Sequence, residues 1–329
     1  FDFIVCGGGT AGLAIAARLS EISNVNVGIV EAGKYRIGDP LIETPATFMQ
    51  MFEDPEYDWC LFTAPQEANN GKVHHIPRGK VLGGSSAINY LMYVRGSLQD
   101  YDDWAALVGD EGWSAANMKA YMRKHQARNT FANPSYEISL TLPFLDPRTG
   151  QSRVQGAASP IAPEHHGTTG PIRTSFNESN LPIETDFVKA CAETANLPNM
   201  PIDAWSGEPY RFYHTLGAVA RTGPNRWKRS YSWIEYYEAN RLRPNLKLFC
   251  EARVNKDILN GTRATGVSIT FRGQEYTVYA RCEVIVFGGT IQSPQILELS
   301  GIGDPEGLAA SGVQSMLENP ADGANVQDH

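Results

Sequence analysis

Three glycines and one glutamate near the start of the chain have the types and spacing of a dinucleotide-binding site. Gly7, Gly9 and Gly12 form a G-x-G-x-x-G pattern directly after an apolar run. The first glycine permits a tight turn, the second lets a pyrophosphate approach the backbone, and the third allows close helix–strand packing. Glu31, nineteen residues after Gly12, can accept both hydroxyls of a ribose and would repel a 2′-phosphate. The pattern therefore favours NAD or FAD over NADP and does not separate those two.

A strand, a helix and a second strand must hold these residues in place. Residues 1–7 are a short apolar run rich in β-forming residues, which predicts a buried strand. Residues 10–22 carry apolar residues at helical spacing, and residues 24–33 contain a second predicted buried strand that ends at Glu31. We expect the phosphates at the helix N-terminus, where free N–H groups and the helix dipole attract anions.

A second glycine-rich stretch lies within residues 78–102, where Gly83 and Gly84 are followed by Ser85 and Ser86. It could be a second loop that contacts an anion or cofactor, or a flexible surface linker. Apolar residues flank it on both sides, namely Val81, Leu82, Ile88 and Leu91. Such flanks argue against a solvated linker.

The stretch 78–102 resembles the first signature of the glucose–methanol–choline (GMC) oxidoreductases, a family of FAD enzymes. The matching residues are Gly79, Lys80, Leu82, Gly83, Gly84, Ser85, Ser86, Ile88, Asn89, Tyr93, Gly96 and Asp102. Residues 289–303 resemble the second family signature, and residues 325–329, NVQDH, resemble a third hallmark. With the first glycine pattern, four features follow one another in the family's order, so the resemblance covers essentially the whole chain.

The resemblance implies FAD as the cofactor and a set of contacts to it. The implied cofactor-binding residues are Gly7, Gly9, Thr10, Ala11, Gly12, Glu31, Ala32, Trp59, Leu82, Gly84, Ser85, Asn89, Tyr90, Leu91, Met92, Val254 and Gly289. Thr10 and Ala11 would contact the pyrophosphate, Glu31 the ribose, and residues 89–92 the isoalloxazine ring. Ala32 and the backbone of Val254 would lie beside the adenine. Trp59 is equally well explained as a core aromatic residue.

Two departures concern the chemistry. Some family members attach FAD covalently through a histidine directly before the signature asparagine, but here that position is Ile88, so we expect dissociable FAD. The family's catalytic base is a histidine with a histidine or asparagine partner, far C-terminal to the Asn-x-Gln-Asp-His motif. We therefore assign no catalytic residue within the chain and expect the pair beyond His329. The chain alone is then expected to be an inactive fragment, with a separate C-terminal chain as one possible partner.

The resemblance also implies the fold class and the domain organisation. We expect an α/β protein with a Rossmann-like FAD-binding domain, in which helices flank a parallel sheet, and an incomplete α+β substrate-binding domain. The FAD-binding domain is expected to be discontinuous, with residues 1–125 and 245–329. Residues 126–244 would hold a loop or lid region and part of the substrate-binding domain, with a helix near 183–196.

Composition excludes several other classes of protein. The net charge is −8 and the pI about 5.4, which disfavours a nucleic-acid partner. No apolar run is long enough to span a membrane. The five cysteines are widely spaced, and the histidine pairs at 74–75 and 165–166 lack acidic neighbours at ligand spacing, so we expect no disulfide framework and no metal. Localisation, secreted or cytoplasmic, stays open because the sequence does not begin with Met.

The leading functional interpretation is FAD-dependent oxidation of a small-molecule alcohol by hydride transfer to flavin N5. The electron acceptor, oxygen or a quinone, is not indicated. The main alternative is a non-redox lyase or cyclase of the same family with a structural flavin. A light-driven decarboxylase on this scaffold and a binding component of a two-chain assembly are further alternatives.

Overall fold

The structure is a computed structural model that describes residues 1–128, 144–145, 152–153, 163–176, 181–197, 203–207, 212 and 215–327. The chain divides into two units, one formed by Phe1–Asn89 with Tyr231–His329 and the other by Tyr90–Ser230. The first unit is discontinuous, but its boundaries differ from the predicted ones at 125 and 245. Residues 90–125, which the prediction included in the FAD-binding domain, fall in the second unit. Their helices, Leu98–Val108 and Ala115–His125, run directly into a strand that pairs there.

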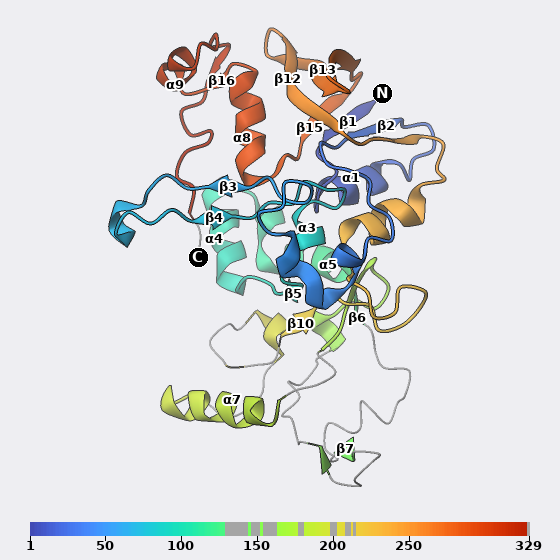
Figure 1. Cartoon of the computed structure of the whole chain (residues 1–329), viewed down its shortest axis with the longest axis vertical. Helices are drawn as coiled ribbons and strands as arrows, with labels where there is room; N and C mark the ends of the chain where they lie inside the picture. Colours follow the sequence, from blue (N-terminus) through green and yellow to red (C-terminus); the bar gives the residue numbers. More distant parts are fainter. Residues whose placement is uncertain are drawn as a thin grey trace. The chain divides into compact units, whose positions relative to one another are not determined.

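A four-stranded parallel sheet forms the centre of the first unit (Figure 1). Its strand order is β11-β2-β1-β15, with β1 at Phe3–Cys6, β2 at Val27–Val30, β11 at Leu246–Phe249 and β15 at Glu283–Val286. Helix α1, Gly12–Leu19, connects β1 to β2, so the predicted strand–helix–strand unit is confirmed. Phe3 is in register with both Val27 and Glu283.

The two central strands, β1 and β2, are buried on both faces, which explains why both are continuously apolar. On β1, Val5 joins a core cluster that includes Leu13 of α1. Ile4 and Cys6 point to the other face, where a second cluster forms. That cluster includes residues of an antiparallel sheet made by β12 (Ala252–Asn260), β13 (Arg263–Phe271) and β14 (Gln274–Tyr279). The predicted Rossmann-like α/β class is therefore confirmed.

Short helices and hairpins complete the first unit. Helix α8 follows β15, and Pro294 lies inside it. The elements are α2 (Pro40–Glu43), η1 (Pro45–Met51), β3 (Leu61–Phe62), η2 (Glu67–Asn69), β4 (His75–Ile76), α3 (Ser85–Ile88), η6 (Trp233–Tyr237), η7 (Glu238–Asn240), α8 (Gly289–Leu299), β16 (Ile302–Gly303), α9 (Pro305–Ala310) and β17 (Leu317–Glu318). The last two residues of the NVQDH motif lie outside the described residues.

The second unit contains three helices of eleven or more residues and several short strands in its described part. Its elements are β5 (Met92–Tyr93), α4 (Leu98–Val108), η3 (Glu111–Trp113), α5 (Ala115–His125), β6 (Gln126–Arg128), β7 (Phe144–Leu145), β8 (Ser152–Arg153), η4 (Pro163–His165), β9 (Ile172–Thr174), α7 (Pro182–Thr194), η5 (Ala204–Ser206) and β10 (Leu216–Gly217). Helix α7 confirms the helix predicted near 183–196. Most of the predicted loop or lid region lies outside the described residues.

One histidine of the 165–166 pair has a structural environment within this unit. His166 is buried, and its Nε2 lies 2.9 Å from Oδ2 of Asp203. Its Nδ1 lies 3.1 Å from the Gln126 side-chain amide nitrogen. These hydrogen bonds account for the burial of a polar ring without any ligand.

None of the helices in the described ranges has the length and apolar character needed to cross a bilayer.

A buried carboxyl group between β12 and α8 makes stability depend on pH. Asp257 is 6 % exposed, and burial raises its pKa from 3.8 to about 6. Its Oδ1 has no hydrogen-bond partner among the described residues. The folded state therefore binds the proton more tightly than the unfolded state, and stability is lost as the pH rises from the unfolded to the folded pKa.

Asp257→Asn is expected to raise the free energy of unfolding above neutral pH by up to about 3 kcal/mol, because an amide carries no charge to desolvate. Below the unfolded pKa the variant and the parent protein should be equally stable. Urea unfolding of both proteins across this pH range measures the difference. A difference that does not change with pH would show that the carboxyl group is not the cause.

Candidate cofactor site

Two glycines of the first turn are required by the packing of the protein itself. Gly7 follows β1 with φ +120°, and a Cβ atom there would overlap the carbonyl oxygen of Phe287, just after β15. A Cβ atom at Gly12 would overlap the carbonyl oxygen of Gly7. These contacts hold the start of α1 directly against the strand end, as the predicted roles of both glycines require.

Gly9 is different, because no protein atom requires a glycine there. The heavy atom nearest to a Cβ at Gly9 is the Cα of Gly84, at 3.7 Å, and the φ of Gly9 is not left-handed. In the described part of the chain, the N–H groups of Gly9, Thr10 and Ala11 donate no hydrogen bond. Open space beside unpaired N–H groups at the start of α1 is the arrangement that binds a phosphate.

Glu31 lies directly after β2 and is tied to the first turn. It is 6 % exposed, its Oε2 accepts the N–H of Gly8 at 2.7 Å, and its Oε1 accepts the N–H of Gly33 at 2.7 Å. Burial raises its pKa to about 7, although both hydrogen bonds act in the opposite direction. Each carboxylate oxygen has a further lone pair, so the group can still accept hydroxyl donors.

The second glycine-rich stretch packs directly on the first turn. Gly83 donates its N–H to the carbonyl of Gly8 at 2.8 Å. A Cβ atom at Gly84, whose φ is +53°, would lie 2.7 Å from the Cα of Gly9. Ser86 donates its N–H to Oγ1 of Thr10 at 3.1 Å. The stretch is therefore part of the candidate site and not a surface linker.

A third glycine turn follows β15, the neighbour of β1 in the sheet. Gly288 directly precedes α8 and Gly289 is its first residue, with φ +87° and no heavy atom within 4 Å of its Cβ position. The turns after β1 and β15 are adjacent, because both follow the carboxyl ends of neighbouring parallel strands. Ligands of open α/β sheets bind at this edge.

The remaining predicted contacts are less closely grouped. Leu82 lies on the second turn beside Gly8, and its Cδ1 would be 2.9 Å from a Cβ added at Gly8. The Trp59 ring contacts the Nζ of Lys80, 5.2 Å from the ring centroid. Val254 lies on β12 and packs against the second core cluster. The other predicted residues of the first unit are Ala32, Ser85 and Asn89.

Three predicted residues belong to the second unit. Tyr90 and Met92 are exposed, and Leu91 is buried with φ +64°. The carbonyl of Leu91 accepts the N–H of Ala218, beside the β5–β10 pair. Tyr90, Leu91 and Met92 are therefore not among the residues that the first unit brings together.

Sequence patterns missed one residue at the junction of the turns. Ser232 is 1 % exposed, and its Oγ lies 3.3 Å from the carbonyl oxygens of both Gly9 and Gly83. It is more than 140 residues from either glycine stretch along the chain. Ser232 belongs to no glycine-rich pattern, so only its position in space identifies it.

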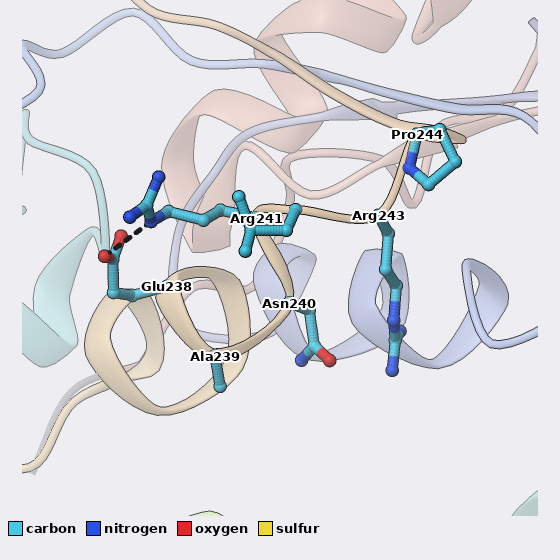
Figure 2. Close-up of a pocket in the computed structure, with 7 residues that line it drawn as sticks. Glu238, Ala239, Asn240, Arg241, Arg243 and Pro244 are labelled. Atoms are coloured by element: carbon cyan, nitrogen blue, oxygen red, sulfur yellow. Dashed lines mark hydrogen bonds and ion pairs between the residues drawn. The ribbon is translucent and has the colours of Figure 1, made fainter.

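A surface pocket of about 510 Å³ lies at the other end of α1 (Figure 2). Its lining residues are Glu238, Ala239, Asn240, Arg241, Leu242, Arg243 and Pro244. Arg241 pairs with Glu238 at 2.7 Å, and Arg243 donates to the carbonyl of Ala17 at 2.6 Å. Because Ala17 is in the last turn of α1, this pocket is separate from the glycine turns at the helix start.

Comparison with known proteins decides the family. The family model described as GMC oxidoreductase matches residues 1–329. The chain belongs to the GMC oxidoreductase family. This confirms the resemblance seen in the three signature stretches.

Individual GMC relatives are similar to this chain over essentially its whole length. The dehydrogenase mpl7 of Monascus purpureus is 40 % identical over 334 residues, which cover 100 % of this chain and 50 % of the relative. An oxygen-dependent choline dehydrogenase of Burkholderia thailandensis is 31 % identical, with 100 % and 52 % covered. An FAD-dependent oxidoreductase structure from Chaetomium thermophilum has a TM-score of 0.80 and 29 % identity, with 97 % and 51 % covered. The chain thus spans about half the length of the curated relatives it matches.

Proposed function

We propose that this GMC chain is the FAD-binding part of an enzyme that oxidises an alcohol. One observation carries the proposal. Gly9 borders open space next to unpaired N–H groups, and the buried Glu31 lies directly after the neighbouring strand β2. Packing does not require that glycine, but a diphosphate would. FAD is the cofactor named for the Chaetomium thermophilum relative. Choline, an alcohol, is named for the Burkholderia thailandensis relative.

We assign the diphosphate, the ribose and the adenine of the cofactor to residues of the chain. The N–H groups of Gly9, Thr10 and Ala11 bind the phosphates, and Glu31 accepts the ribose hydroxyls. The adenine lies beside Ala32 and Val254. The remaining proposed contacts are Gly7, Gly12, Trp59, Leu82, Gly84, Ser85, Asn89, Tyr90, Leu91, Met92 and Gly289. When bound, FAD supplies the N5 atom that accepts a hydride from the alcohol carbon.

No residue of the chain is assigned as the catalytic base. The alcohol must lose its hydroxyl proton as the hydride leaves, and a neutral histidine suits that step near neutral pH. We propose that this base is supplied from beyond His329 or by a second chain. Residues 1–329 alone would then bind FAD without oxidising alcohols.

The function is tested by anaerobic mixing of small alcohols, choline included, with the FAD-loaded protein in the presence of the segment or second chain that supplies the base. Residues 1–329 alone are the negative control. Reduction by an alcohol should bleach the visible flavin absorbance and yield the corresponding carbonyl compound. Product without any bleaching would support the lyase or cyclase alternative and contradict the proposal. A protein that never binds FAD would contradict it at an earlier step.

Denaturation of the protein is expected to release FAD in chemically unchanged form. The position before Asn89 is Ile88, whose alkyl side chain is 2 % exposed and belongs to the core. This side chain can form no covalent bond to the flavin. Acid precipitation should therefore release all the flavin into the supernatant, and mass spectrometry should find it as free FAD. Flavin that stays with the pelleted protein would identify another attachment residue.

A further inference from the structure

Ser232 places a single hydroxyl group where the first and second glycine turns meet. It precedes η6, which packs on α1 within the first unit. Its Oγ lies 2.9 Å from Oγ of Ser86, 3.3 Å from the carbonyl oxygen of Gly9 and 3.3 Å from that of Gly83. One buried side chain therefore contacts both backbone segments that border the proposed phosphate site.

The shortest hydrogen bond in the group fixes the direction of the others. Ser86 Oγ lies 2.6 Å from the carbonyl oxygen of Gly83, which can only accept, so the Ser86 hydroxyl donates there. Ser86 Oγ is then an acceptor, and the N–H of Ser232 donates to it at 3.3 Å. The hydroxyl proton of Ser232 then has three acceptors within reach, namely Ser86 Oγ at 2.9 Å and the carbonyl oxygens of Gly9 and Gly83 at 3.3 Å each.

A hydrogen bond to the Gly9 carbonyl also determines where the next N–H points. The Gly9–Thr10 peptide group is planar and trans, so its C=O and N–H point in opposite directions. The carbonyl of Gly9 is held by the N–H of Leu13 and by the buried Ser232 hydroxyl, each at 3.3 Å, so the N–H of Thr10 points away from the core. Thr10 is exposed, and its N–H donates no hydrogen bond to the described residues. The Thr10 side chain is held too, because Oγ1 accepts the N–H of Ser86.

We propose that Ser232 is a positioning residue for the FAD diphosphate. It holds the Gly9–Thr10 peptide so that the Thr10 N–H faces the phosphate, and it keeps the two glycine turns together before the cofactor arrives. Preorganised donors bind more tightly because their ordering cost is met in the free protein. This inference rests on the proposed FAD site.

Ser232→Ala tests the proposal in the apoprotein reconstituted with FAD. Loss of one such hydrogen bond should weaken FAD binding about tenfold, measured by quenching of flavin fluorescence. The phosphorus NMR signals of bound FAD should shift, because the donor next to the phosphate is no longer fixed. Unchanged affinity together with unchanged phosphorus shifts would overturn the proposal.

Ser300→Ala is the matched control. Ser300 is also buried, accepts the N–H of Asp257 at 2.7 Å and donates to the carbonyl of Ile296 at 2.6 Å. It lies at the far end of α8 from the glycine turns. Its removal should lower stability without changing the FAD affinity or the phosphorus shifts. Equal losses of affinity in both variants would mean a general structural effect and would also overturn the proposal.

Two further variants keep the test decisive. Ser232→Cys preserves size with a weaker donor, so it should fold and bind FAD with intermediate affinity even if Ser232→Ala does not fold. In a double-mutant cycle, Ser86→Ala should cost less affinity in the Ser232→Ala background than in the parent, and full additivity would contradict the coupling. If the parent protein binds no FAD, the proposed function itself fails. If it binds FAD and the Ser232 variants match it, only the positioning role fails.

Discussion

Replacing Gly9 with alanine is expected to weaken FAD binding about 10- to 100-fold, since an added methyl group in a filled site costs about 1–3 kcal/mol. The apoprotein should keep its stability. The new Cβ would make only an ordinary contact, 3.7 Å from the Cα of Gly84, and the backbone conformation suits any residue. The methyl group would instead occupy the space proposed for the diphosphate. Thermal unfolding of the apoprotein and a flavin fluorescence titration measure the two effects separately.

Gly12→Ala provides the contrast within the same turn. Its Cβ would overlap the carbonyl oxygen of Gly7 and lie 3.2 Å from Cγ1 of Val5, inside the packed helix–strand contact. The apoprotein itself should then be destabilised, by several kcal/mol if the turn cannot move. The prediction for Gly9 fails if its alanine variant binds FAD like the parent protein, or if both variants lose the same stability.

Glu31→Gln is expected to remove most of the pH dependence of FAD binding. The ribose hydroxyls donate to a carboxylate, so binding favours the deprotonated form. Because the pKa of Glu31 in the free fold is raised to about 7, a large fraction of the group is protonated below neutral pH. The affinity for FAD should therefore rise as the pH increases through about 7, with release of a proton on binding. Glutamine cannot titrate, so its affinity should be lower and flat.

The same carboxyl group makes the stability of the apoprotein fall with increasing pH, whereas it makes the affinity for FAD rise. Its folded pKa of about 7 is above the ordinary value of 4.5, so the folded state binds the proton more tightly. Stability should be lost as the pH rises from the lower to the higher value, by about 3 kcal/mol in total. Glu31→Gln should abolish this loss.

Denaturant unfolding and FAD titrations at several pH values test both effects. Glu251→Gln is the control, because it removes an exposed carboxylate from the segment whose N–H donates to the carbonyl of Gly33. A parent protein whose FAD affinity does not change with pH would refute the role of Glu31. So would a Glu31→Gln variant that retains the parent's slope.

Local sequence determined the first strand–helix–strand unit and its turn. Residues 3–30 form two adjacent parallel strands and the helix between them, so hydrophobic spacing and glycine positions within one short segment were sufficient. The position of Glu31 at the end of β2 followed from the same pattern. The family signatures added the second and third glycine turns and the cofactor.

Tertiary structure alone decided how these turns meet. Gly84 touches Gly9, and Ser232 contacts both turns from more than 140 residues away. Glu31 accepts the N–H of Gly8 and is buried enough to raise its pKa. The unit boundary at Asn89 also depended on the pairing of β5, which follows it, with the distant strand β10. Such features require long chain segments to close on one another, and residue patterns record only which residues prefer burial, not which distant partner they meet.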